Sequence, residues 1–310
     1  MAPNTEPNLF AGGALDRLTE HRHDAAWVEA SLADAQAQFL VGWDQLSPVL
    51  VQADRPAVAA LARDAVEPWL AQAREVLLLG RMNGRLYFGL NFDAAPAADL
   101  PFTPTELRKV AASLEAGEAG LLAYFRALGH WHREHRYCGH CGGPTRSIAA
   151  GHERQCEHCG TRAFPRVDPA VIMLVECGER CLLGSQTPQQ PRRYSTLAGF
   201  VEPGESLEDA VRREVFEETG IEVTAAHYHS SQPWPFPASL MLGFSAEGCE
   251  APVTLRDGEL QDARWFTRAE LAEGLRGGKF TLSSPQSIAY RLIRNWYERD
   301  GSSLADLTLG

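Results

Sequence analysis

Three glutamates that would share one face of a helix are the residues of this sequence best suited to chemistry. Glu214, Glu217 and Glu218 stand at positions i, i+3 and i+4 of a charged segment, 207–219, that we predict to be helical. Carboxylates held together repel one another, and clustered hard oxygen ligands are what Mg²⁺ or Mn²⁺ requires. Such a cluster on its own is more often a solvated acidic face, so the surrounding residues decide between the two interpretations.

The residues around this helix define its ends and support its carboxylates. Ser206 is a good N-cap, with Asp209 three residues on as in a capping box, and Gly220 supplies the stop. Arg213 could reach a neighbouring carboxylate and fix its orientation. Gly199, which precedes the helix, allows close approach of the backbone.

The spacing of the whole segment resembles the Nudix box at every defined position. Gly199 is followed after five residues by Glu205, after seven more by Arg213-Glu214, and then by Val215, Glu217-Glu218, Gly220 and Ile221. The resemblance implies a Nudix domain, an α/β/α sandwich in which a loop–helix–loop binds divalent metal at a diphosphate. It implies that Glu214 and Glu218 are metal ligands and that Glu217 is a third ligand or the group that activates water. Glu205 and Arg213 have supporting roles by the same resemblance.

A proline-rich segment follows thirteen residues after Glu218 and reads SQPWPFPAS over 231–239. Its alternating prolines make it stiff and extended, with little entropy left to lose on binding. Trp234 and Phe236 would then be held ready to stack on flat ligands. Gln232 and Ser239 could hydrogen-bond a base edge, an amide or a phosphate. Judged from the residues alone, a buried proline–aromatic corner between strands is an equally good explanation.

The motif SQPWPFPxS after a Nudix box is typical of the NADH pyrophosphatase subgroup, which the chain resembles from about Tyr137 to its last helix. The resemblance implies a substrate-binding loop made of Gln232, Pro233, Trp234, Pro235, Phe236, Pro237, Ala238 and Ser239. It adds Phe164, Phe200, Ala289 and Arg108 as further substrate contacts. It also adds the carbonyl of Ala198 and the carboxylate of Glu259 as metal ligands.

The sequence departs from the subgroup pattern at two positions. Phe164 stands where relatives often carry tyrosine, so a stacking role survives and a hydroxyl contact is lost. Gly151 replaces a substrate-contacting glutamate of some relatives, and Glu153 lies nearby.

Four cysteines form two pairs, Cys138-x₂-Cys141 and Cys156-x₂-Cys159, separated by fourteen residues. This spacing favours a structural zinc site, because four thiolates complete the tetrahedron and leave no open position. A redox pair or two disulfides are the alternatives. We expect Cys177, Cys181 and Cys249 to be buried and to pack as small hydrophobic side chains.

These motifs need mixed strands and helices to position them, which predicts an α+β protein rather than a doubly wound sheet. We expect a smaller mixed N-terminal domain over 1–130, a zinc ribbon over 131–164 and a catalytic Nudix domain over 165–310. The predicted elements are a hairpin of 76–79 and 86–90 around Asn83-Gly84, helices at 105–129, 207–219 and 285–299, and strands at 170–175, 181–184 and 239–245.

The composition narrows the class of protein. The formal net charge of -11 disfavours broad, non-specific nucleic-acid binding. The protein can still bind phosphates where metal ions supply the positive charge. No apolar run predicts a membrane span, and the N-terminus lacks the features of a signal peptide. With cysteine pairs suited to metal, the chain is expected to work in a reducing compartment, the cytoplasm.

Two functions of different class follow. The first is metal-dependent hydrolysis of NADH or NAD⁺ to nicotinamide mononucleotide, reduced or oxidised, and AMP, together with removal of NAD caps from RNA 5′ ends. Both activities are implied by the subgroup resemblance, as is a homodimer. A basic patch of Arg133, Arg136, Arg146, Arg154 and Arg162 could guide RNA. The alternative is a zinc-ribbon nucleic-acid-binding protein with a vestigial Nudix domain, against which the intact carboxylates argue.

Overall fold

The computed structural model describes residues 6–51, 55–96, 99–249, 251–256 and 258–307. The chain forms two compact units. One contains Asp168–Gln232, the chain from Ser239 onward and residues up to Asn8, and the other contains Leu9–Val167 and Pro233–Ala238. No helix among the described residues is long and apolar enough to cross a membrane.

The first unit is built on a six-stranded sheet with the order β15-β16-β11-β12-β17, in which β14 also pairs with β11. Its strands are β11 (Asp168–Cys177), β12 (Arg180–Ser185), β14 (Leu197–Phe200), β15 (Val223–Trp234), β16 (Ser239–Gly248) and β17 (Asp262–Thr267). The central pair, β11 and β16, runs parallel, and the other pairings of β11 are antiparallel. The sequence predicted β11, β12 and β16 and missed β15, β14 and β17.

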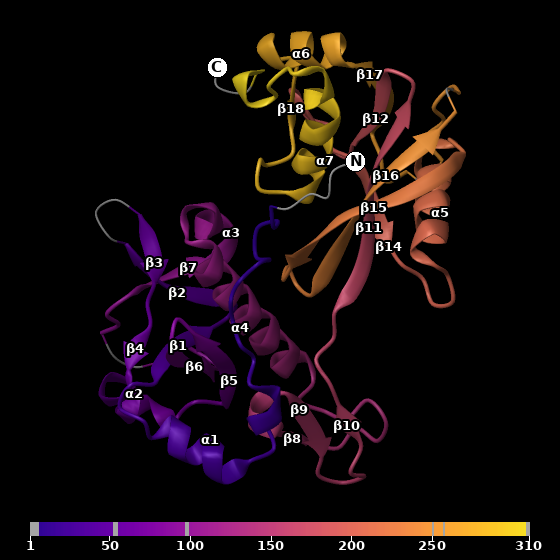
Figure 1. The fold of residues 1–310 in the computed structure, drawn as a ribbon. Coiled ribbons are helices and arrows are strands. Elements are labelled where there is room, and N and C mark those ends of the chain that lie inside the picture. Colours follow the sequence, from indigo (N-terminus) through magenta and orange to yellow (C-terminus); the bar gives the residue numbers. More distant parts are fainter. Residues whose placement is uncertain (1–5, 52–54, 97–98, 250, 257, 308–310) are drawn as a thin grey trace. The chain divides into compact units, whose positions relative to one another are not determined.

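Strand β11 explains why this sheet is covered on both faces. Val171, Met173 and Val175 pack with helix α5 (Leu207–Thr219) on one face. Ile172 and Leu174 point the other way, into a core shared with α7 (Ile288–Tyr297) and α6 (Arg268–Arg276). Successive side chains of a strand alternate between faces, so one apolar run serves both layers. The result is the expected α/β/α sandwich (Figure 1).

Helix α5 has the predicted ends. The Ser206 hydroxyl accepts a hydrogen bond from the backbone N–H of Asp209, and Gly220 closes the helix in the left-handed conformation with φ 72°. Helix α7 is shorter than the predicted 285–299, because the Ser287 hydroxyl caps it and it begins at Ile288. A small pair, β13 (Arg192–Tyr194) and β18 (Phe280–Leu282), completes this unit.

The second unit holds a four-stranded sheet, β4-β1-β6-β5, and a three-stranded one, β3-β2-β7. The strands are β1 (Gln38–Trp43), β2 (Leu46–Val51), β3 (Pro56–Val58), β4 (Leu61–Ala62), β5 (Glu75–Met82), β6 (Arg85–Phe92) and β7 (Thr103–Glu106). Helices α1 (Ala25–Leu32), α2 (Arg63–Leu70), α3 (Leu107–Val110) and α4 (Ala116–Glu134) pack around them. The hairpin prediction is confirmed, with Asn83 and Gly84 both at positive φ.

The single helix predicted over 105–129 is wrong. The chain is a strand to Glu106, forms the short helix α3, and is extended at Leu114 before α4 begins. Leu107, Ala111 and Leu114 are buried in the same core as α4. Their spacing continues the helical pattern although the backbone bends between them, so periodicity could not reveal the break.

The cysteine-rich segment forms a three-stranded sheet of β8 (Thr145–Ile148), β9 (Glu153–Cys156) and β10 (Arg162–Ala163). A buried polar network joins it to the N-terminal strands and to α4. Arg154 Nη1 donates to a Glu75 carboxylate oxygen and, at 2.8 Å, to His132 Nδ1. His132 Nε2 donates to the Gly151 carbonyl at 2.8 Å. Since a carbonyl only accepts, this geometry places a proton on Nε2 of His132.

Candidate functional site

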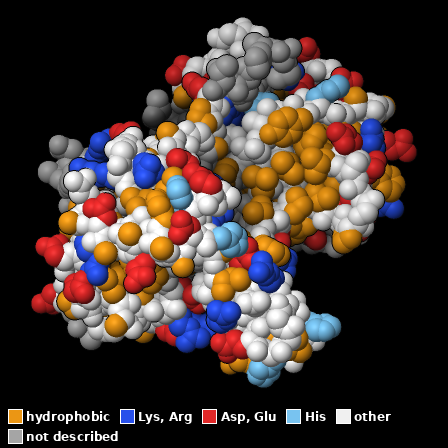
Figure 2. Space-filling model, turned by 60° about the horizontal axis from the view of Figure 1, so that its bottom comes forward, with side chains coloured by type: hydrophobic (Ala, Val, Ile, Leu, Met, Phe, Trp, Pro, Cys, Tyr) orange, Lys and Arg blue, Asp and Glu red, His pale blue; other side chains and the backbone are white. Residues whose placement is uncertain are grey.

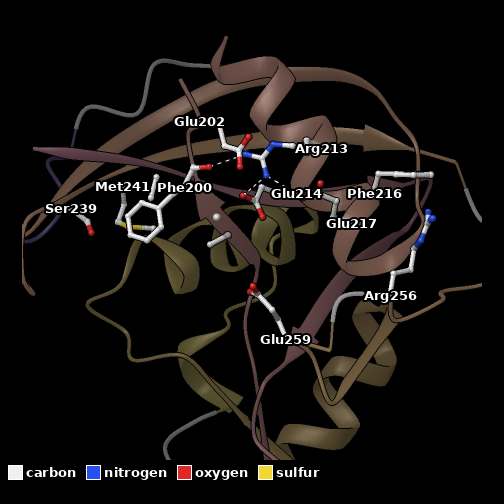
Figure 3. A pocket seen from close by; sticks show the side chains of 13 residues that line it. Phe200, Glu202, Arg213, Glu214, Phe216, Glu217, Ser239, Met241, Arg256 and Glu259 are labelled. Carbon is white, nitrogen blue, oxygen red and sulfur yellow. Dashed lines mark hydrogen bonds and ion pairs between the residues drawn. The ribbon is translucent and has the colours of Figure 1, made fainter. Parts of the chain in front are cut away.

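A cavity of about 950 Å³ lies in the first unit, lined largely by residues of α5, β14 and β16. Its lining consists of Ala170, Ala198, Gly199, Phe200, Glu202, Arg213, Glu214, Phe216, Glu217, Ser239, Met241, Arg256 and Glu259. Figure 3 shows Phe200, Met241 and Ser239 at one end, the carboxylates in the middle, and Phe216 with Arg256 at the other end. The cavity therefore joins an apolar end to an acidic centre.

Arg213 organises the acidic centre. Its guanidinium donates to Glu205 Oε1 at 2.6 Å, to Glu214 Oε1 at 2.8 Å and to Glu217 Oε2 at 3.1 Å. It also donates to the carbonyl of Phe200 at 2.8 Å, which ties α5 to the end of β14. These hydrogen bonds are the geometry that the predicted supporting role of Glu205 and Arg213, as groups that orient the carboxylates, would require. The hydrogen bond from Arg213 also lowers the pKa of Glu205.

Gly199 is required because Glu214 lies directly against the backbone there. A Cβ built on Gly199 would stand 1.8 Å from the carboxyl carbon of Glu214. Any side chain at this position would displace the carboxylate, so the close approach expected of this glycine is confirmed.

Burial raises the pKa of Glu214, and the negative charges of Glu217 and Glu259 raise it further, while Arg213 opposes them. Glu214 is thus a largely buried carboxyl group held near two others that line the same cavity. A cation would relieve that repulsion, and oxygen ligands of this kind suit Mg²⁺ or Mn²⁺. These oxygen donors are of the type that a divalent metal takes. Among the described residues, the group of three or more possible ligands that already converges is the four cysteines.

Of the other predicted metal ligands, Ala198 and Glu259 line the cavity, and Glu218 does not. Ala198 lines the cavity on β14, next to Gly199. Glu259 reaches the cavity from the loop before β17 (Figure 3). Glu218 is 2% exposed and belongs to the buried side of α5.

Of the predicted substrate contacts, Phe200 and Ser239 line the cavity. The Phe200 side chain is exposed, which leaves its ring accessible. Gln232 is buried, and its amide accepts from the Ile288 N–H and donates to the Gln286 carbonyl, so it braces the start of α7. Ala289 is buried in the core on α7.

Sequence reasoning missed five charged or apolar residues of the lining: Ala170, Glu202, Phe216, Met241 and Arg256. Two of them had a signal in the sequence. Met241 lies two residues after Ser239, on the same face of a strand, and Phe216 is a large apolar residue just outside the buried stripe of α5. Arg256 lies in a loop, and no spacing rule connects it to the helix.

The residues Pro233–Ala238 belong to the second unit, where their rings are packed by N-terminal side chains. Phe10 approaches Trp234 and Phe236 with ring centroids 6.3 and 6.0 Å apart. The Arg108 guanidinium lies 4.2 Å from the centre of the Phe236 ring and 5.4 Å from that of Trp234. Both rings are half-buried, and Pro235 is buried while Pro237 is exposed.

Arg126 on α4 hydrogen-bonds the backbone of the segment Pro233–Ala238. Its Nε donates to the Pro235 carbonyl at 2.8 Å and its Nη1 to the Gln45 carbonyl at 2.6 Å. The guanidinium also lies 4.8 Å from the centre of the Phe236 ring. Burial lowers the pKa of Arg126 to about 10, helped by the charges of Arg133 and Arg108, so it remains a cation at neutral pH.

The four paired cysteines converge at one point. Their Sγ atoms all lie within 4.8 Å of one another, with Cys138–Cys159 at 3.7 Å and Cys141–Cys156 at 3.4 Å. Four sulfurs around a tetrahedral zinc at about 2.3 Å each would stand about 3.8 Å apart. A disulfide needs about 2.0 Å, so the separations fit zinc and not disulfides.

The remaining cysteines differ from the expectation. Cys181 is buried, and burial raises the pKa of its thiol. Cys177 is half-buried and Cys249 is exposed, so the prediction of three buried cysteines is wrong for these two. Both lie at the ends of their strands or beyond them, where side chains reach solvent.

The predicted basic patch near the ribbon is largely engaged within the second unit. Arg154 is buried in the Glu75–His132 network, which is why it cannot belong to a surface patch. Arg162 pairs with Glu153 at 3.3 Å, and Arg136 pairs with Asp93. Gly151 has φ 91°, and a Cβ there would stand 2.5 Å from Leu77 Cδ2, so no glutamate fits at this position. Phe164 is exposed.

Three family models match successive parts of the chain. Residues 36–131 match the NADH pyrophosphatase-like rudimentary NUDIX domain, 133–164 the NADH pyrophosphatase zinc ribbon domain, and 165–283 the NUDIX domain. The middle match covers the four converging cysteines. The last match contains every residue that lines the cavity.

Two relatives align along nearly the whole chain. NAD-capped RNA hydrolase NudC of Mycobacterium bovis is 36% identical, over 94% of this chain and 94% of the relative. NAD-capped RNA hydrolase NUDT12 of Macaca fascicularis is 33% identical, over 93% of this chain and 73% of the relative. With the cavity, the zinc ribbon and the domain order, these matches show that the chain belongs to the NADH pyrophosphatase family of Nudix hydrolases.

Proposed function

We propose that this protein hydrolyses the pyrophosphate bond of NADH or NAD⁺, giving nicotinamide mononucleotide and AMP, and removes NAD caps from RNA 5′ ends. The observation that carries the proposal is the cavity that Glu214, Glu217 and Glu259 line together with an exposed aromatic residue, Phe200. A dinucleotide offers the matching groups, a diphosphate beside flat bases. The names of the two aligned relatives agree with this substrate.

Glu214, Glu217, Glu218 and Glu259, with the carbonyl of Ala198, would hold Mg²⁺ or Mn²⁺. When bound, such a metal neutralises the diphosphate and makes hydroxide available from water near neutral pH.

The chain's own residues then have separate tasks. Arg213 holds Glu214 and Glu217 in place through its two hydrogen bonds. The side chain of Glu217 is 52% exposed, so its carboxylate is the one best able to accept a proton from water. Phe200 would stack on one base, and Ser239 would hydrogen-bond the same half of the substrate.

Trp234, Phe236 and Arg108 select the dinucleotide, with Gln232, Ala289 and the prolines shaping the loop, and Phe164 offers a further ring. The three segments 1–130, 131–164 and 165–310 remain the proposed domains, and the first two pack into one compact unit. A cytoplasmic location is part of the proposal because two cysteine pairs with zinc-site spacing favour a reducing compartment.

A homodimer is part of the same proposal. Hydrophobic side chains gather on one face of the unit that contains the cavity (Figure 2). Contiguous apolar surface of this kind marks association sites in soluble proteins. Sedimentation of the full chain should give about twice the monomer mass of 34.0 kDa.

The decisive experiment incubates the purified protein with NADH and Mg²⁺ or Mn²⁺ and measures AMP and reduced nicotinamide mononucleotide. We expect Glu217→Gln to lower kcat by about 10²–10⁴-fold with an unchanged melting temperature, since a general base contributes that much. Glu208→Gln, an exposed glutamate on the same helix, serves as the control. RNA binding without any hydrolysis by the unaltered protein would favour the nucleic-acid-binding alternative instead.

A further inference from the structure

The end of the cavity opposite Phe200 carries a second aromatic residue paired with a cation. Phe216 comes from α5 and Arg256 from the loop that leads to Glu259 (Figure 3). The Arg256 guanidinium lies 4.4 Å from the centre of the Phe216 ring. The Phe216 side chain is 40% exposed, so its ring is not part of the core that α5 buries.

The two arginines of the cavity are in different states. Arg213 is engaged by three carboxylates and a carbonyl. Arg256 makes no ion pair within the described part of the chain, and its guanidinium rests on the aromatic ring. The only other charges in the lining are the carboxylates of Glu202, Glu214, Glu217 and Glu259. Arg256 is therefore the cation of this lining that remains available to an anion.

We propose that Phe216 and Arg256 form a subsite for the RNA strand that continues beyond the diphosphate of an NAD-capped RNA. This inference rests on the proposed function. In this proposal the adenosine half of the substrate lies on the Phe216 side of the carboxylates, where a free dinucleotide ends and a capped RNA continues through a phosphodiester. A guanidinium binds a phosphate through paired hydrogen bonds, and an exposed ring stacks on a base.

The charge of the site makes such a residue necessary for a polyanionic substrate. Four glutamates line the cavity and the whole chain carries a formal charge of -11, so each further phosphate of RNA meets repulsion. A metal ion at the carboxylates would neutralise the charge of the diphosphate only. Arg256 supplies positive charge where the next phosphate leaves the centre, and Phe216 holds the guanidinium there until RNA displaces it.

The test compares two substrates across a salt series. Values of kcat/KM are measured for NADH and for an NAD-capped oligoribonucleotide with the unaltered protein, Arg256→Gln, Arg256→Lys and Phe216→Leu. Arg276→Gln, an exposed arginine on α6 with the same change of charge, is the control. Thermal melts of all variants show that the fold is kept.

We expect Arg256→Gln to lower the ratio of kcat/KM for capped RNA to that for NADH by roughly tenfold. Its slope of log kcat/KM against log salt for capped RNA should fall by about 0.7, the contribution of one contacted phosphate of a single strand. Arg256→Lys should retain most of the salt slope, and Phe216→Leu should lower the ratio without changing the slope. Arg276→Gln should change neither.

Two results would overturn the inference. Equal losses on both substrates would place Arg256 at the diphosphate or in the fold, and an unchanged ratio with an unchanged slope would leave it without a role in RNA recognition. Failure of the proposed function would be distinguished from both results, because the unaltered protein would then not release AMP from NADH.

Discussion

Gly199 and Glu214 show how closely single residues constrain this site. The carboxyl group of Glu214 occupies the space where a side chain at position 199 would stand. Arg213 then fixes the same carboxylate from the other direction at 2.8 Å. The position of this carboxylate is therefore set by contact on one side and by a charged hydrogen bond on the other.

We expect Gly199→Ala to lower kcat with NADH by about 10²-fold, because displacing a reacting group by about 1 Å has effects of that size. The fold should persist, since the added methyl group meets a side chain that can move. Steady-state kinetics and a thermal melt would measure both effects. Gly139→Ala is the control, because nothing lies within 4 Å of a Cβ built there. Full activity in Gly199→Ala would show that Glu214 need not stay in its present position.

The residues of the site could be predicted from the sequence where one element supplies them. Glu214, Glu217 and Arg213 share a helix whose spacing and caps are visible in the residues themselves. Arg256 and Met241 could not be predicted, because their place in the cavity depends on how a loop and a strand pack against that helix. Spacing describes one element, and a cavity is built by several.

Among the elements, the loop 233–238 depends on α4 for its conformation. Arg126 uses its planar group to bond the carbonyls of Pro235 and Gln45 at once. We expect Arg126→Lys to raise KM for NADH several-fold and to lower the melting temperature, because an ammonium cannot reproduce both bonds in one plane. Losing a buried hydrogen bond costs about 1–3 kcal/mol. Kinetics and calorimetry against Arg85→Lys, an exposed arginine of β6, would check this. An unchanged KM would separate the loop's conformation from substrate binding.

The zinc ribbon is an element with few apolar residues of its own. We expect Cys138→Ser to lower the zinc content below one ion per chain and to lower stability, because metal binding supplies about 10–16 kcal/mol in small zinc peptides. Cys249→Ser, which changes an exposed cysteine outside the cluster, should change neither. Elemental analysis and a thermal melt would decide, and zinc-free protein of normal stability would contradict a structural zinc.

The stability of the whole molecule should depend on the protonation of a buried histidine. His152 Nε2 donates to the Leu78 carbonyl at 2.7 Å, and Tyr124 OH lies 3.4 Å from Nδ1. Burial lowers the pKa of His152 to about 4, despite the hydrogen bond to Leu78. The unfolded chain therefore binds a proton at higher pH than the folded one does.

A histidine with a lowered folded pKa leaves stability intact above about pH 6.5 and removes it as pH falls toward about 4, by up to about 3 kcal/mol. We expect His152→Gln to be less stable at pH 7 and to lose less stability over that interval. Denaturant unfolding at several pH values, with His227→Gln as an exposed control, would measure it. Parallel curves for His152→Gln and the unaltered protein would refute the assignment.

The fold of the molecule was predicted in its class and missed in several of its parts. Strand β15 carries mostly polar, half-exposed side chains and lacks a clear alternation, so the sequence gives it no strand signal. Strand β11 was predicted because its apolar run is buried on both faces. Burial leaves a pattern in the residues, and pairing through the backbone alone does not.

The membership of Pro233–Ala238 in the second unit has a consequence for synthesis on the ribosome. The rings of Trp234 and Phe236 pack against Phe10 and Arg108, and residues 168–232 are made in between. While that stretch emerges, Phe10 lacks the two rings that later pack against it. The N-terminal unit thus acquires its last part only after much of the catalytic unit has been translated. A fragment ending at Val167 would expose this apolar surface and should associate or bind chaperones, whereas the full chain covers it.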